Sequence, residues 1–155
     1  MPQMNKGGKF IFGKSIIRPD GNVQLPTQAI NEYNIIKEGK VYLLTGSKVT
    51  GGFCITRKGL LLPSKLGHVL NDVIQLLNYT SKSGEFIKYK GRFYTWRDIS
   101  ETGQINLTRE MMEFLSIKSG MQLLSIRSSD IAFTMGAKGP LLEKAKIYKG
   151  VIPLY

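Results

Sequence analysis

Short stretches of alternating apolar and polar residues make up much of the chain, and they recur in the same order in its two halves. Such alternation is typical of a strand with one buried face. The alternating residues Val23 and Leu25, and Ile105 and Leu107, predict one short strand of this kind in each half. Residues 10–17 and 92–99 are predicted to be the strands that come before them, and a polar turn with Gly21 or Gly103 lies between. We therefore expect a protein built mainly from β-strands.

The first predicted strand overlaps a phosphate-loop pattern. The stretch from Gly8 to Ser15, GKFIFGKS, fits G-x-x-x-x-G-K-[ST] letter for letter. A phosphate loop needs a buried strand before it and a helix after it. Here MPQMNKG precedes the pattern and a Pro-Asp-Gly turn follows it, while Phe and Ile inside it favour extended backbone. We interpret the stretch as a strand.

Two segments of the chain form an internal repeat. Residues 17–62 align with residues 99–142 at an offset that falls from 82 to 80, so two one-residue gaps suffice. Glycines and apolar residues dominate the matches, which indicates that the structure is what repeats. The matched pairs include Gly21 with Gly103, Leu25 with Leu107, Ile36 with Ile117, Gly39 with Gly120, Phe53 with Phe133 and Gly59 with Gly139.

Each unit is predicted to be β-β-α-β-β. Its short helix is predicted to begin at Pro26 in the first unit, because proline suits the first helical position. In the second unit Thr108 is a predicted N-cap. A unit of this size cannot bury both faces of a sheet alone, so we expect the two units to share one core. The predicted fold class is α+β, mainly β with short helices.

One amphipathic helix of roughly 12–15 residues is predicted between the units. Its apolar residues recur at helical spacing and could cover the core or meet a second copy of the chain. The expected organisation is a first repeat at 8–62, this linking helix within 63–83, a second repeat at 84–142 and an extension at 143–155, folded as one unit. A homodimer contact is predicted at Leu66, Val69, Leu70, Val73 and Leu77.

Charge is the strongest compositional signal. The 155 residues hold 22 Lys or Arg against 11 Asp or Glu, a net charge of +11. Both halves are basic, with +7 before Gly84 and +4 after it. A field of this sign favours a polyanionic partner, nucleic acid first and an anionic membrane second.

Other chemistry is sparse in the sequence. The single cysteine, Cys54, cannot form an internal disulfide, and no apolar run approaches a membrane span, so we expect a cytoplasmic protein without a membrane partner. The single histidine, His68, has no clustered cysteine or acidic partner. No catalytic pair or triad stands out, so we expect no enzyme activity, no metal site and no cofactor.

The pattern IRPDGNVQLP…YNIIKEGKVYLL resembles the AbrB-like DNA-binding family, which includes AbrB, SpoVT and MazE-type antitoxins. In the second unit Gly103, Ile105, Leu107, Ile117 and Gly120 carry the same pattern. The resemblance covers roughly 90 residues. It implies two repeats that exchange hairpins within one barrel, here as a fused pseudo-dimer similar to the MraZ proteins.

The resemblance also implies where DNA would be contacted. The family uses arginines on the entering strand, after the turn glycine and on the short helix. The first position holds Ser15 or Arg97 here, the second holds Asn22 or Gln104, and the helix positions are not basic. Amide side chains can form hydrogen bonds to the edge of adenine in the major groove, and nearby cations can contact phosphates. The predicted DNA-binding residues are Lys14, Arg18, Asn22, Arg92, Arg97, Gln104 and Arg109.

Three functions follow from these features. The first is a DNA-binding transcriptional regulator that contacts double-stranded DNA. The second is a protein-interaction or dimerisation module, using the linking helix and the apolar residues 151–155. The third is a barrel that binds a small molecule or nucleotide, by fold analogy alone.

Overall fold

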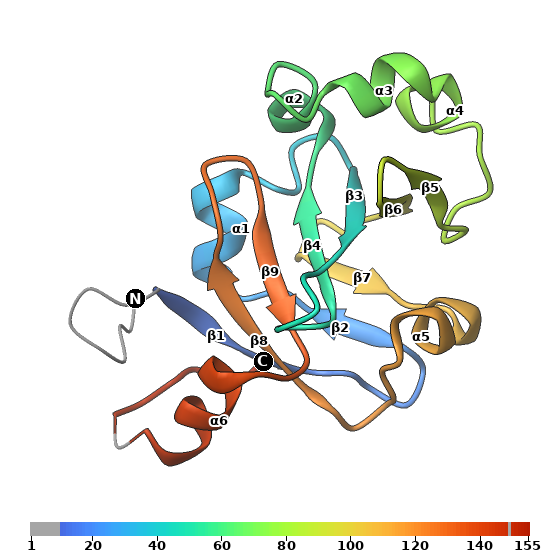
Figure 1. The fold of residues 1–155 in the computed structure, drawn as a ribbon. Coiled ribbons are helices and arrows are strands. Elements are labelled where there is room, and N and C mark those ends of the chain that lie inside the picture. The colour runs from blue at the N-terminus through green and yellow to red at the C-terminus, as the bar shows by residue number, and fades with distance from the viewer. Residues whose placement is uncertain (1–9, 149) are drawn as a thin grey trace.

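The computed structural model describes residues 10–148 and 150–155, and it is mainly β with short helices (Figure 1). One seven-stranded antiparallel sheet and one two-stranded ribbon account for all strands of the described residues. The strands are β1 (Ile11–Ile16), β2 (Asn22–Gln24), β3 (Lys40–Thr45), β4 (Phe53–Thr56), β5 (Ile87–Tyr89), β6 (Arg92–Asp98), β7 (Gln104–Asn106), β8 (Gln122–Arg127) and β9 (Phe133–Gly136). The helices are α1 (Thr27–Tyr33), α2 (Lys58–Leu61), α3 (His68–Asp72), α4 (Ile74–Leu77), α5 (Arg109–Leu115) and α6 (Pro140–Ile147).

The predicted strands at residues 10–17 and 92–99 are confirmed as β1 and β6. In β1 the side chains of Phe12 and Ser15 are almost fully buried, so this backbone does not wrap a phosphate. Gly8 and Lys9, the start of the phosphate-loop pattern, lie outside the described residues. Gly21 and Gly103 both have positive φ, +85° and +84°, as their polar turns require.

The strand order of the large sheet is β1-β8-β9-β4-β3-β6-β5. The entering strand of each half pairs with a strand of the other half, β1 with β8 and β6 with β3. The ribbon also joins the halves, because β2 pairs with β7 and Val23 lies opposite Ile105. The sheet ends at β1 and β5, so the closed barrel expected from the sequence is not found among the described residues.

The main core lies between the inner face of the sheet, the ribbon and the two helices α1 and α5. Rings from three segments meet in it, with centroids of Phe12 and Phe133 6.1 Å apart and those of Tyr33 and Phe133 5.1 Å apart. The ribbon contributes Val23 and Ile105 to the same core, because alternate residues of a strand face opposite sides and the polar neighbours of these two face outward. The predicted cap of α5 is confirmed, because Thr108 accepts a hydrogen bond from the Met111 N–H at 3.1 Å. Pro26 precedes α1 as its N-cap residue, one position earlier than predicted.

The prediction of one linking helix is wrong. Two short helices, α3 and α4, occupy residues 63–83, after α2 has ended at Leu61, and Val73 separates α3 from α4 with φ −113° and ψ 83°. A β-branched residue favours such extended backbone. The short pieces let Val69 and Leu70 turn fully into a second apolar cluster on the outer face of the sheet, beside Tyr42 and Tyr94.

This burial removes the argument for a homodimer contact through the linking segment. Of the five predicted contact residues, Val69 and Leu70 have no exposed surface, and Val73 and Leu77 are packed against the same cluster. Leu66 is the one that remains exposed, at 44%. A buried residue cannot meet a second chain without local unfolding.

The C-terminal segment differs from the expected extension in two ways. Helix α6 spans residue 142, the predicted end of the second repeat, and it covers Ile11 and Leu124 on the outer face of the sheet. The last residues then run beside β1, with the Lys14 N–H donating to the Pro153 carbonyl at 2.8 Å. Part of the apolar tail is therefore occupied within the chain, although Val151 and Leu154 remain exposed.

Candidate nucleic-acid interface and an adjoining groove

The β2–β7 ribbon presents four amide side chains on its outer side, two from each strand. Asn106 Nδ2 donates to Asn22 Oδ1 at 2.9 Å, and Asn22 Nδ2 donates to Asp20 Oδ2 at 3.1 Å. Gln24, which lies opposite Gln104, donates from Nε2 to the Thr102 carbonyl at 2.8 Å. The predicted base reader Asn22 is thus part of a network that links the two halves.

Arg97 lies beneath this ribbon and is bound within the protein. Its Nε donates to the Asn106 carbonyl at 2.8 Å, and its Nη1 donates to Ser83 Oγ at 3.1 Å. Burial lowers the pKa of the Arg97 guanidinium, and the carboxylate of Asp98 opposes that shift. These contacts make Arg97 a link between β6, β7 and the segment before β5.

The other predicted cations near the ribbon are dispersed. Arg18 is exposed in the turn before β2, whereas Lys14 is half-buried on β1 next to the C-terminal residues. Arg109 is exposed at the start of α5, and its Nε lies 3.2 Å from Glu113 Oε1 in an ion pair. The structure does not bring these three side chains together.

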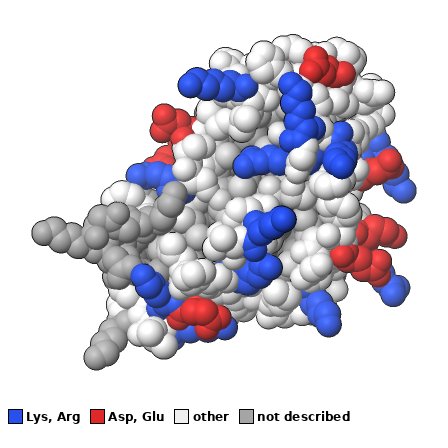
Figure 2. Space-filling model, in the orientation of Figure 1, with Lys and Arg blue, Asp and Glu red and all other residues white. Residues whose placement is uncertain are grey.

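The charge around the ribbon has the wrong sign for phosphate binding. Residues 18–34 and 97–113, which hold its turns, strands and flanking helices, contain three Lys or Arg against six Asp or Glu, a net −3. Residues 37–96 contain ten against three, a net +7. Figure 2 shows Lys and Arg side chains gathered across the upper middle of the face in view, while Asp and Glu lie mostly nearer its outline.

Arg92 belongs to this basic region. It begins β6, five residues or about 16 Å of extended strand from Arg97. A hollow of about 320 Å³ brings Arg92 together with Lys65, Lys90 and His68, and two tyrosines complete its wall. We call the cations Lys65, Lys90 and Arg92 the basic cluster.

Sequence analysis selected Arg92 and missed Lys65 and Lys90. The alternation Lys88-Tyr89-Lys90-Gly91-Arg92 was a usable signal, because a basic run that contains a glycine turn places its cations at the tip of a hairpin. The sequence around Lys65 contains no pattern that predicts its place in the basic cluster. Its position depends on how α2 and α3 pack over the sheet.

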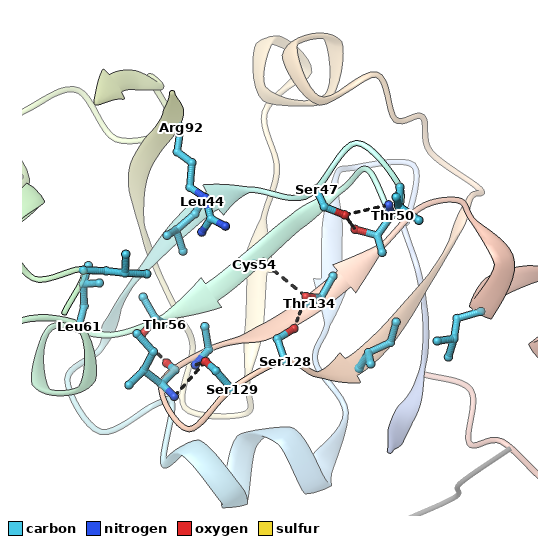
Figure 3. A pocket seen from close by; sticks show the side chains of 16 residues that line it. Leu44, Ser47, Thr50, Cys54, Thr56, Leu61, Arg92, Ser128, Ser129 and Thr134 are labelled. Carbon is cyan, nitrogen blue, oxygen red and sulfur yellow. Dashed lines mark hydrogen bonds between the residues drawn. The ribbon is translucent and has the colours of Figure 1, made fainter. Parts of the chain in front are cut away.

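A groove adjoins the basic cluster on the outer face of the sheet (Figure 3). It has a volume of about 480 Å³ and shares Arg92 and Leu66 with the neighbouring hollow. Cys54 Sγ lies 3.4 Å from Thr134 Oγ1, and Thr134 is in turn hydrogen-bonded to Ser128. Burial raises the pKa of the Cys54 thiol, so the thiolate form is disfavoured there.

Neither a metal centre nor a membrane span is found in the described part of the chain. No group of three or more His, Cys, Asp or Glu side chains within residues 10–148 and 150–155 is arranged to hold a metal ion. No helix among these residues is long and apolar enough to cross a bilayer.

A comparison of the chain with protein-family models and with curated proteins finds no match.

Proposed function

We propose that the protein is a DNA-binding transcriptional regulator of AbrB-like type, with its phosphate contacts centred on the basic cluster. The repeated sequence pattern supports the family assignment. The pairing of β1 with β8 and of β6 with β3 is what two repeats with exchanged hairpins would produce. The ribbon between β2 and β7 is then the axis about which the halves are related.

The separation of charge carries the choice of surface. DNA binding depends on cations that neutralise phosphates. The ribbon region has a net charge of −3 and would repel the phosphates of DNA. The region from residue 37 to 96 has the opposite sign, and Lys65, Lys90 and Arg92 are all exposed in it. Tyr89 is half-buried in the same hollow and offers a ring to an unpaired base at a duplex end.

Two triple variants of equal charge test this surface. The first changes Lys65, Lys90 and Arg92 to Gln, and the second changes Lys14, Arg18 and Arg109 to Gln. Binding to a short random duplex is measured by fluorescence anisotropy at several salt concentrations. We expect the first variant to lower both the affinity and the salt slope, the slope by about 2–3 units at about 0.9 per lost phosphate contact.

The second variant distinguishes the proposed surface from the one predicted by the sequence. It should bind like the wild type apart from a small uniform loss that follows from the lower net charge. A larger loss in the second variant than in the first would place DNA at the ribbon. Absence of salt-dependent binding by the wild type at low ionic strength would overturn the proposed function.

A further inference from the structure

The groove exists because two separate sets of helices cover the outer face of the sheet incompletely. Helices α2, α3 and α4 cover Tyr42 and Leu44 on one side, and α6 covers Leu124 on the other. Between them Cys54 and Thr134 line the floor of the groove (Figure 3). Val49 and Leu66 stand at the rim with 62% and 44% of their surfaces exposed. The volume of about 480 Å³ falls within the roughly 300–1,000 Å³ of small-molecule sites.

The walls of the groove are suited to an apolar body. Leucine, isoleucine and valine side chains supply much of the lining. Most of the hydroxyl groups are already engaged within the protein, as Thr56 donates to the Ile131 carbonyl at 2.6 Å and Ser47 lies 3.1 Å from Thr50. A ligand rich in polar groups would lose its hydrogen bonds to water and find few unpaired donors here. A hydrocarbon chain has no such hydrogen bonds to lose.

One end of the groove is suited to an anion. Arg92 is the one charged side chain in the described lining, and it reaches from β6 toward Leu44 (Figure 3). No salt bridge to Arg92 occurs among the described residues. Lys65 and Lys90 line the hollow that shares Arg92, so three cations gather at this end of the groove.

We propose that this groove binds a free amphipathic carboxylate, with an acyl chain along the apolar walls and the carboxylate at Arg92. The assignment follows from apolar walls that end at an unpaired guanidinium flanked by two further cations. A guanidinium binds a carboxylate through charge-assisted hydrogen bonds, and these are stronger at the edge of an apolar site than in water. The proposal does not depend on DNA binding.

The test uses decanoate as the probe and isothermal titration calorimetry on the full chain without nucleic acid. Decanol supplies the same chain without the charge, and acetate supplies the charge without the chain. We expect saturable one-to-one binding of decanoate, weaker binding of decanol and none of acetate. The Arg92→Gln variant should bind decanoate about tenfold more weakly and leave decanol unchanged, as the loss of one charged hydrogen-bonding partner predicts.

Arg109→Gln is the matched control, since it removes the same charge from an exposed site outside the groove. Both substituted residues are exposed, and circular dichroism checks that both variants fold. Amide NMR shifts should locate the ligand at Cys54, Thr134 and Leu66. The proposal is overturned if decanoate does not bind saturably, binds no better than decanol, or binds Arg92→Gln as well as it binds the wild type.

Discussion

Ser15 and Arg97 occupy matching positions in the two halves of the protein, and each donates a side-chain hydrogen bond to the equivalent backbone carbonyl. Ser15 Oγ donates to the Gln24 carbonyl at 2.6 Å, and Arg97 Nε donates to the Asn106 carbonyl at 2.8 Å. In each half the acceptor lies nine residues after the donor, at the end of the ribbon strand. A short hydroxyl and a long guanidinium therefore hold the entering strand against the ribbon at matching positions.

Replacing Arg97 should destabilise the fold. Arg97→Leu removes three hydrogen bonds, two to Asn106 and one to Ser83, and should lower the free energy of unfolding by about 2 kcal/mol, the typical value for bonds to a charged group. Urea denaturation measures the change. Ser15→Ala should cost less, about 1 kcal/mol, because a single neutral bond is lost. Equal stability of Arg97→Leu and the wild type would mean that these bonds do not hold the ribbon.

The N-cap of α5 should contribute measurably to stability. Thr108→Ala removes the hydrogen bond to the Met111 N–H and should cost about 1 kcal/mol. Thr27→Ala is the matched control, because Thr27 begins α1 in the other half without such a bond from its side chain. Thermal unfolding of both variants checks the difference. A Thr27→Ala loss as large as that of Thr108→Ala would argue against the cap.

The contact between Gly13 and the C-terminal residues should be sensitive to one methyl group. A Cβ at Gly13 would lie 2.8 Å from the Tyr155 ring and 2.9 Å from the Pro153 carbonyl oxygen. Gly13→Ala should displace the tail and cost about 1–3 kcal/mol, as overpacking does. Carboxypeptidase should then trim the variant faster than the wild type. Unchanged trimming and stability would show that the tail does not pack on β1 as described.

Tyr33 should make the protein less stable at high pH. Burial, with a smaller contribution from Glu32, raises the pKa of Tyr33 from 10.0 to about 12. The folded state therefore holds this proton more tightly, so the contribution to stability is complete below pH 10 and is lost between pH 10 and 12. Urea denaturation at pH 8, 10 and 11 measures the decline.

Tyr33→Phe isolates that contribution. The variant lacks the hydrogen bond from Tyr33 Oη to the Ser129 carbonyl, 2.6 Å long, and should lose about 1 kcal/mol at pH 8. Its further loss toward pH 11 should be smaller than that of the wild type. The decline should not vanish, because burial also raises the pKa of Tyr42. Parallel curves for the variant and the wild type would contradict the assignment.

Cys54 should react slowly with thiol reagents. Burial raises its pKa, so less thiolate is present at pH 8 than for an ordinary cysteine. Labelling with a chromogenic disulfide should be slower in the native protein than in urea. A native rate as fast as the unfolded rate would contradict the burial of this thiol at the groove floor.

Local features determined which elements form and where they begin. Aromatic and β-branched residues predicted β1 because they favour extended backbone, and the internal repeat predicted β6 as its counterpart. Thr108 marked the start of α5 because a hydroxyl satisfies a helix N–H whatever the surrounding fold. Turn glycines fixed the two corners, since Gly21 and Gly103 must adopt positive φ. These outcomes depend on neighbours along the chain.

Only the tertiary structure decided what the side chains contact. The residues of the linking segment fit one helix by period, yet the backbone at Val73 separates α3 from α4, and Val69 and Leu70 are fully buried against the sheet. Arg97 looked like a free cation in sequence, and its burial beneath Asn106 depends on a pairing between strands. The basic cluster and the groove likewise join residues that are far apart along the chain. Which of these residues lie close together is set by how the strands and helices pack, and local sequence patterns do not contain that information.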